Sequence, residues 1–214
     1  MNYFAHGRRF IDDPYFLAGT AVPDWLNVVD RRTRVRSKQA EAFCEATEAQ
    51  VARLAAGIMQ HHRDDAWFHA TRAFAETSLE LCRRMRQVLP ADDGFRPHFL
   101  GHILVEILLD AALIADDPPR LAAYYEAVKR VDGAVVEAAV SAMSGRPTPN
   151  LGTFVGLFSR ERFLSDYSDD AKLWFRLNQV MRRVRLPLLG PNLVESLPAA
   201  RGLVAERKDA LLAA

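Results

Sequence analysis

Cysteine is scarce in this sequence, which contains Cys44 and Cys82 and no other thiol. Two cysteines provide neither a disulfide framework nor a cysteine-based zinc site. No stretch of about 18 apolar residues is present to span a bilayer, and the N-terminal MNYFAHGRRF lacks the apolar run of a signal peptide. These absences predict a soluble, unprocessed protein of the reducing cytoplasm that has no membrane partner.

An excess of one charge is also missing, because 28 basic residues are balanced by 27 acidic ones and the formal net charge is +1. Such a balance gives no global attraction to nucleic acid or to an anionic membrane. An anionic ligand must therefore be met by a local basic surface. The candidates are RRTRVRSK at 31–38, RRMR at 83–86 and RRVR at 182–185, each of which could equally be a solvated helix face.

Strand-like alternation is absent too, whereas apolar residues recur at helical spacing, as at Val51, Leu54, Ala55 and Ile58. The sequence therefore predicts an all-α fold. Its length fits a single domain over 1–214, with a metal-site region over 1–115 and C-terminal helices over 120–214.

Breakers and caps indicate where the helices begin and end. Residues 37–89 predict one very long helix, or two that meet at a bend between 63 and 67, where Asp64 and Asp65 could cap the second. Pro90 would end this run. The other predicted helices cover 97–115, 120–143, 160–185 and 193–212, and SGRPTPNLG is the clearest loop.

Histidine is absent beyond residue 102, and the six histidines stand at 6, 61, 62, 69, 98 and 102. In GIMQHHRDDAWFH, His61, Asp65 and His69 follow one another at i, i+4 and i+8, which would align them along one ridge of a helix. Two imidazoles that flank a carboxylate are a ligand set for a divalent metal. The alternative is that these polar residues only cover a solvated face.

A second ridge repeats this spacing in PHFLGHILVE, where His98, His102 and Glu106 stand at i, i+4 and i+8. The surrounding residues are apolar, so this helix should be buried on most sides. Buried imidazoles and carboxylates need partners, and one metal shared between the two ridges would satisfy both. Alternatively, His102 is a core histidine bonded to a backbone carbonyl, and Glu106 reaches solvent or pairs with an arginine.

Two further candidate ligands lie near the N-terminus. His6 follows the apolar segment YFA, and Asp24 lies within the apolar segment FLAGTAVPDWL. A buried carboxylate requires a cation, so both side chains could join the metal site. His6 could instead be a surface residue near a chain end, and Asp24 could be an N-cap after a proline turn.

With these residues in place, the sequence resembles the acyl carrier protein phosphodiesterases, small all-α metal-dependent hydrolases related to the HD phosphohydrolases. Five segments match the family's motifs in order over residues 1–187: MNYFAH, LAGTAVPD, AGIMQHHRDD, the looser PHFLGHIL, and FLSDYSDDAKLWFRLNQVMRRV. The first three segments contain His6, Asp24 and the His61 and Asp65 pair.

The sequence also departs from that family's pattern. Pro97 replaces an aspartate before the His-Phe-Leu segment, and Phe68 with His69 replaces a Thr-Asp pair. Glu106 stands one turn after His102, a His-x-x-x-Glu arrangement that is similar to zinc-dependent phospholipase C. The resemblance therefore implies a shared metal centre and leaves the substrate open.

The resemblance implies an HD-domain-like helical bundle that holds Mn²⁺, Fe²⁺ or Zn²⁺ in a mononuclear or dinuclear site. The metal would lower the pKa of a bound water toward neutrality for attack on phosphorus. The leading hypothesis gives the site six protein ligands, of which the first three form the inner set: His61, Asp65, His102, His6, Asp24 and Glu106.

Other side chains would assist the reaction. His69 or His98 would protonate the leaving oxygen, and His62 or Arg63 would bind a non-bridging oxygen. The resemblance implies release of 4'-phosphopantetheine from a serine of an acyl carrier protein. Two alternatives are a phosphohydrolase of a small molecule or lipid headgroup, which the position of Glu106 favours, and a non-catalytic helical protein with a structural metal.

Overall fold

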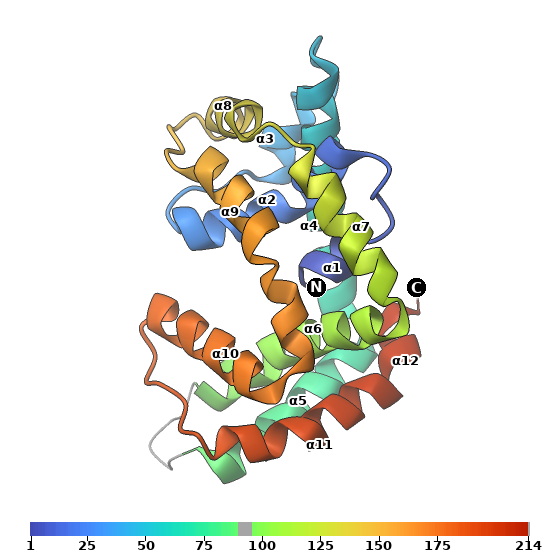
Figure 1. Ribbon diagram of the computed structural model, residues 1–214, viewed down its shortest axis with the longest axis vertical. Helices are drawn as coiled ribbons and strands as arrows, with labels where there is room; N and C mark the ends of the chain where they lie inside the picture. Colours follow the sequence, from blue (N-terminus) through green and yellow to red (C-terminus); the bar gives the residue numbers. More distant parts are fainter. Residues whose placement is uncertain (90–95, 214) are drawn as a thin grey trace. The chain divides into compact units, whose positions relative to one another are not determined.

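The computed structural model describes residues 1–89 and 96–213, and all regular elements in these ranges are helices (Figure 1). The all-α prediction is confirmed. Contacts between segments divide the chain into two compact units. Unit 1 consists of Met1, 67–116 and 163–214, and unit 2 consists of 2–66 and 117–162. Each unit therefore combines segments from both of the regions that the sequence predicted.

Unit 2 is built around α2 (Pro14–Val29), which contacts α1 (Tyr3–Gly7), α7 (Pro118–Lys129) and α9 (Leu151–Glu161). This unit also contains α3 (Ser37–Glu41), α8 (Gly133–Ser144) and all but the last residues of α4 (Ala49–Ala70). Buried aromatic rings meet at its centre: Phe4, Trp25, Tyr124 and Phe158. Burial of such large rings contributes strongly to the stability of a core.

Two glycines bring α2 and α4 into close contact. A Cβ on Gly57 of α4 would collide with the carbonyl oxygen of Phe16, and a Cβ on Gly19 of α2 would collide with the carbonyl oxygen of Leu54. Because neither residue has a side chain, the two backbones can meet at this point. The crossing places the part of α4 that carries His61 against α2.

Unit 1 is built around α5 (Arg72–Val88) and α6 (Arg96–Asp116), which lie against each other. Gly101 permits their approach, since a Cβ there would lie 2.5 Å from the carbonyl oxygen of Ser78. Helix α11 (Leu193–Glu206) runs along both helices (Figure 1). The 3-10 helix η1 (Phe163–Ser168), α10 (Asp170–Val184) and α12 (Lys208–Leu212) complete the unit.

The prediction that no stretch is long and apolar enough to span a bilayer is wrong for helix α6, which meets that requirement by length and composition, with a mean hydropathy of 1.7 over its most apolar window. In the structure 61% of that window is buried, as in the core helix of a soluble protein. A single helix of this kind is weak evidence for a membrane span. The cytoplasmic location and the absence of a membrane partner stay predictions.

The long helical stretch breaks at other places than the sequence predicted. Helix α4 continues through the predicted bend at 63–67 and ends at Ala70, and α5 begins after Thr71, whose hydroxyl accepts a hydrogen bond from the Phe74 N–H at 3.2 Å. Asp64 and Asp65 do not cap a helix, because their carboxylates contact histidines instead. Turns at 42–48 also separate α3 from α4, and the predicted end at Pro90 lies outside the described residues.

The remaining helix predictions hold in part. The helix predicted at 97–115 is confirmed as α6, and the loop of SGRPTPNLG is confirmed between Ser144 and Leu151. The single helix predicted at 120–143 is wrong, because Asp132 caps a new helix there by accepting a hydrogen bond from the Ala134 N–H. The helices predicted at 160–185 and 193–212 are also divided, at η1 and at Arg207.

Candidate metal centre

Helix α4 is continuous over the histidine-rich segment, so His61, Asp65 and His69 lie on successive turns of one helix, as their spacing predicts. The described residues contain two groups of three potential ligands. The His6 cluster consists of His6, His61 and Asp65 in unit 2, and the His69 cluster consists of His69, His102 and Glu106 in unit 1. In each cluster the three ligand atoms lie within 4.8 Å of one another.

In the His6 cluster one imidazole faces each oxygen of a carboxylate. His6 Nε2 lies 3.2 Å from Asp65 Oδ1, and His61 Nε2 lies 3.4 Å from Asp65 Oδ2. The two rings are stacked, with centroids 4.2 Å apart and planes at 27°. Both histidines are buried, whereas the Asp65 side chain is 31% exposed. The cluster therefore reaches solvent through Asp65.

Both imidazoles are also held at Nδ1. His61 Nδ1 lies 2.8 Å from the carbonyl oxygen of Thr20 in α2, and His6 Nδ1 lies 3.2 Å from Asp64 Oδ2. Asp64 is fixed in turn by the side-chain amide of Gln60, which donates to Oδ1 at 2.6 Å. A carbonyl oxygen only accepts hydrogen bonds, so His61 Nδ1 carries a proton and Nε2 of the neutral ring carries a lone pair.

These contacts favour a cation beside Asp65. The Nε2 lone pair of neutral His61 would face an anionic oxygen, which is unfavourable unless a proton or a metal ion lies between them. His6 Nε2 is buried and makes no hydrogen bond within the described ranges, although Asp65 Oδ1 is near. Two imidazole nitrogens and a carboxylate oxygen fit Zn²⁺, Fe²⁺ or Mn²⁺.

The charges of this cluster are strongly coupled. Burial lowers the pKa of His6, but contacts with the carboxylates of Asp64 and Asp65 outweigh burial and raise it to about 9. Burial raises the pKa of Asp65, but the imidazoles of His6 and His61 lower it well below its usual range. The carboxylate therefore stays ionised, and a proton on His6 and a metal ion are alternative counter-charges for it.

The six predicted ligands are divided between the two clusters. His102 and Glu106, which the leading hypothesis joins to His61 and Asp65, meet His69 in unit 1. His69 thus lies among candidate ligands, although it was predicted as a proton donor. Among the residues that the structure describes, Glu106 contacts two imidazoles and the Met1 amino group rather than an arginine, and His102 contacts Glu106 rather than a backbone carbonyl. The predicted arginine partner of Glu106 and the predicted carbonyl partner of His102 are therefore wrong.

Asp24 lies in neither cluster of the described residues. It is half-buried in the middle of α2, one turn after Thr20, and Pro23 stands within the helix beside it. The alternative that Asp24 caps a helix is therefore wrong, because α2 is capped by Asp13. Since residues one turn apart share a helix face, Asp24 lies on the face of α2 that carries the Thr20 contact to His61.

His98 and Arg63, the other predicted catalytic residues, also lie outside both clusters. His98 is exposed at the start of α6, with Nδ1 3.5 Å from Cys82 Sγ and Nε2 3.0 Å from a guanidinium nitrogen of Arg86. Arg63 is exposed on α4 and donates to the side-chain oxygen of Gln60 at 2.8 Å. None of these three contacts involves one of the six candidate ligands.

Sequence reasoning missed two contributors to the His6 cluster. Asp64 was predicted as a helix cap, yet it orients His6, and its position one turn after Gln60 was the available signal. Thr20 acts through its backbone carbonyl, which no side-chain pattern can indicate. Both act on the ring orientation of a ligand and contribute no ligand atom themselves.

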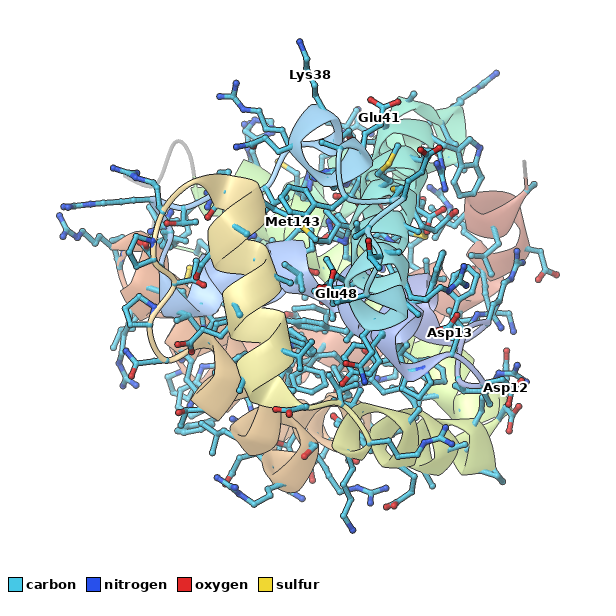
Figure 2. The ribbon with its side chains drawn as sticks, turned by 90° about the horizontal axis from the view of Figure 1, so that it is seen from above. Asp12, Asp13, Lys38, Glu41, Glu48 and Met143 are labelled. Atoms are coloured by element: carbon cyan, nitrogen blue, oxygen red, sulfur yellow. The ribbon has the colours of Figure 1, made fainter. Side chains whose placement is uncertain are left out.

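The basic segment 31–38 lies beside the His6 cluster. Thr33 and Val35 are buried, whereas the cationic residues of the segment are exposed: Arg31, Arg32, Arg34, Arg36 and Lys38. Figure 2 shows Lys38 extending away from the ribbon. His62, the neighbour of His61, places Nε2 2.8 Å from the carbonyl oxygen of Val35 and ties the segment to α4. The backbone of this basic segment is thus fixed to α4 at the residue that follows His61.

No protein-family model matches the chain, and no curated protein or solved structure is significantly similar to it. The geometry of the two clusters is therefore the basis on which a function can be argued.

Proposed function

We propose that the protein is a metal-dependent hydrolase of phosphate esters and that His6, His61 and Asp65 hold its metal. The supporting observation is the pair of stacked imidazoles that present Nε2 to Asp65 while Nδ1 contacts Thr20 or Asp64. Hydrogen bonds at the far nitrogen orient metal-binding histidines in this way. Three protein ligands leave coordination positions for water and substrate, as in catalytic zinc sites.

Each residue of the centre has a task in this proposal. His6 and His61 supply nitrogen ligands, and Asp65 supplies an oxygen ligand from the side that reaches solvent. Asp64 orients His6, and Asp24 is the candidate for a further ligand. A divalent ion bound there supplies a Lewis acid and an activated water for attack on phosphorus.

The substrate that we propose is a phosphodiester on an acidic protein. Two observations support it: the exposed cations of segment 31–38 are tied to α4 next to His61, and the sequence resembles the acyl carrier protein phosphodiesterases. The reaction would release 4'-phosphopantetheine from a carrier-protein serine. Exposed arginines attract an acidic surface and speed its encounter. A small phosphodiester or a lipid headgroup is the competing substrate.

Two assays on protein loaded with Mn²⁺, Fe²⁺ or Zn²⁺ test the proposal: release of apo carrier protein from holo carrier protein, and hydrolysis of bis(p-nitrophenyl) phosphate. We expect the wild type to hydrolyse at least one of them. The His61→Ala and Asp65→Ala double variant should lose both the activity and the metal of this site, because it removes two of three ligands.

The matched control removes an exposed ion pair at the same i, i+4 spacing, between Arg72 and Glu76 on α5. The Arg72→Ala and Glu76→Ala double variant should keep metal and activity. Full metal content in the His61→Ala and Asp65→Ala variant would contradict the ligand assignment. Metal that depends on His61 and Asp65 but supports no hydrolysis of any phosphate ester would favour a structural metal and contradict the proposed activity.

A further inference from the structure

The His69 cluster joins the end of α4 to α6 within unit 1. His69 lies on the last turn of α4, and His102 and Glu106 lie one turn apart on α6. The cluster uses no residue of the His6 cluster. What it binds can therefore be considered separately from the proposed function.

Both imidazoles point to the same carboxylate oxygen. His69 Nε2 lies 2.8 Å from Glu106 Oε1, and His102 Nε2 lies 3.3 Å from it. Ligand atoms around one tetrahedral ion with bonds of about 2.1 Å are about 3.4 Å apart. The spacing of the three groups thus needs only small side-chain shifts to place two nitrogens and one oxygen around one ion.

The carboxylate of Glu106 already attracts a cation in the structure. The amino group of Met1 lies 3.3 Å from the same oxygen of Glu106, so a metal ion bound there would take the place of this ammonium. Burial raises the pKa of Glu106, but this amino group and the imidazoles of His102 and His69 lower it to about 2. The carboxylate is therefore ionised throughout the physiological pH range, and its side chain is only 17% exposed.

Aromatic contacts hold the two imidazoles in place. The Phe74 ring meets both edge-on, with centroids 4.8 Å from His69 and 5.0 Å from His102. Phe74 is itself positioned by the Thr71 hydroxyl that caps α5. Ring packing thus limits the rotation of both ligands, as a hydrogen bond does at His61.

The cluster stays accessible from solvent. The side chains of His69 and His102 are 32% and 45% exposed, whereas the histidines of the His6 cluster are buried. An ion held here could exchange with solution and keep coordination positions for water. Two imidazoles and one carboxylate with open positions is a known ligand set for divalent transition metals.

We propose that His69, His102 and Glu106 form a second site for a divalent transition ion, such as Zn²⁺ or Co²⁺, which is independent of the His6 cluster. The site takes its ligands from α4 and α6 and is complete within unit 1. Because it shares no ligand with the proposed hydrolase centre, it can exist whether or not that centre is catalytic.

Titration of the full chain with Co²⁺, after removal of bound metal by a chelator, tests this proposal through the visible absorption and the number of ions bound. The wild type should bind two ions per chain. His102→Ala and Glu106→Gln should each bind one ion, as should His61→Ala, which affects the other cluster. His98→Ala is the matched control for stoichiometry, because His98 lies one turn before His102 on α6 and outside the cluster.

A wild type that binds one ion, removed by His61→Ala and unaffected by His102→Ala, would overturn the second site and leave the hydrolase centre intact. One ion removed by His102→Ala but not by His61→Ala would instead support this site and contradict the hydrolase centre. Loss of both ions in His102→Ala would overturn independence. His69→Ala is a second test of the site in case His102→Ala fails to fold. It should also bind one ion, and circular dichroism should show the helix content of the wild type.

Discussion

His61 of α4 donates its Nδ1 proton to the carbonyl oxygen of Thr20 in α2, across a distance of 2.8 Å. The two glycines of the helix crossing stand next to this bond: Gly57 lies one turn before His61, and Gly19 directly precedes Thr20. The packing of α2 on α4 and the orientation of a candidate metal ligand are therefore set by the same contact.

Adding a side chain where α2 and α4 cross should lower both the stability of the fold and the affinity for metal. Gly57→Ala places a Cβ against the carbonyl oxygen of Phe16, so we expect the free energy of unfolding to fall by roughly 1–3 kcal/mol, as for other overpacked sites. Metal affinity should fall with it. The control is Gly202→Ala in α11, where a Cβ would meet nothing within 4 Å. Equal stability of the two variants in urea would contradict this role of Gly57.

Stability should depend on pH through His6. Because its pKa is raised from 6.5 to about 9 in the folded protein, folding retains a proton that the unfolded chain loses. The stabilisation is fully present below about pH 6.5 and is lost as the pH rises through about 9. In urea with a chelator present, unfolding free energies at about pH 6 and about pH 9.5 should differ by at most on the order of 3 kcal/mol.

Asp64→Asn provides the control for this pH dependence. It removes one of the two carboxylates that raise the pKa of His6 while keeping the size of the side chain. The loss of stability between the two pH values should become smaller in this variant. A wild-type stability that is constant over this range would show that His6 does not retain its proton.

Asp24 should affect turnover more than folding. Asp24→Asn keeps the shape of the side chain and removes its charge, so the melting temperature should change little while kcat falls by at least about 100-fold. Asp12→Asn, at an exposed position before α2 (Figure 2), should leave kcat unchanged. An effect of Asp24→Asn confined to KM would argue against a place at the reaction centre.

The basic segment should act on the encounter with an acidic partner. Replacing Arg31, Arg32 and Arg34 by alanine should raise the KM for holo carrier protein and weaken its salt dependence, because exposed charges are screened beyond a Debye length of about 8 Å. Turnover of a small chromogenic diester should not change. The control is Arg83→Ala, which removes an exposed arginine paired with Glu80 on its own helix. It should change neither the KM for holo carrier protein nor the turnover of the small diester.

The positions of ligands on one helix could be predicted from the sequence, but their partners could not. Spacing places His61, Asp65 and His69 on successive turns, yet each step of four residues also turns the side chain by about 40° around the axis. His61 and His69 therefore point about 80° apart, and the two ends of the ridge serve different clusters. The contact of His6 with His61 depends on packing between segments far apart in the sequence.

Several neighbouring residues could each cap the helix, which explains why its boundary was predicted at the wrong place. Asp64, Asp65 and Thr71 are all plausible caps, and the sequence favoured the two aspartates. The structure uses Thr71, because the carboxylates of Asp64 and Asp65 bind His6 instead. A contact from a distant segment thus decided a boundary that propensity alone could not.

Because the segments of the two units alternate along the chain, the units become complete at different times during synthesis. Unit 2 needs no residue beyond Arg162, whereas unit 1 needs the segment that begins at Phe163. On the ribosome, at about 5–20 residues per second, the apolar helix α6 emerges seconds before α11, which covers it. During this interval α6 can pack on α5 but lacks the cover of α11, while unit 2 can already be complete. We therefore expect a chaperone to bind first at the face of α6 that α11 later covers.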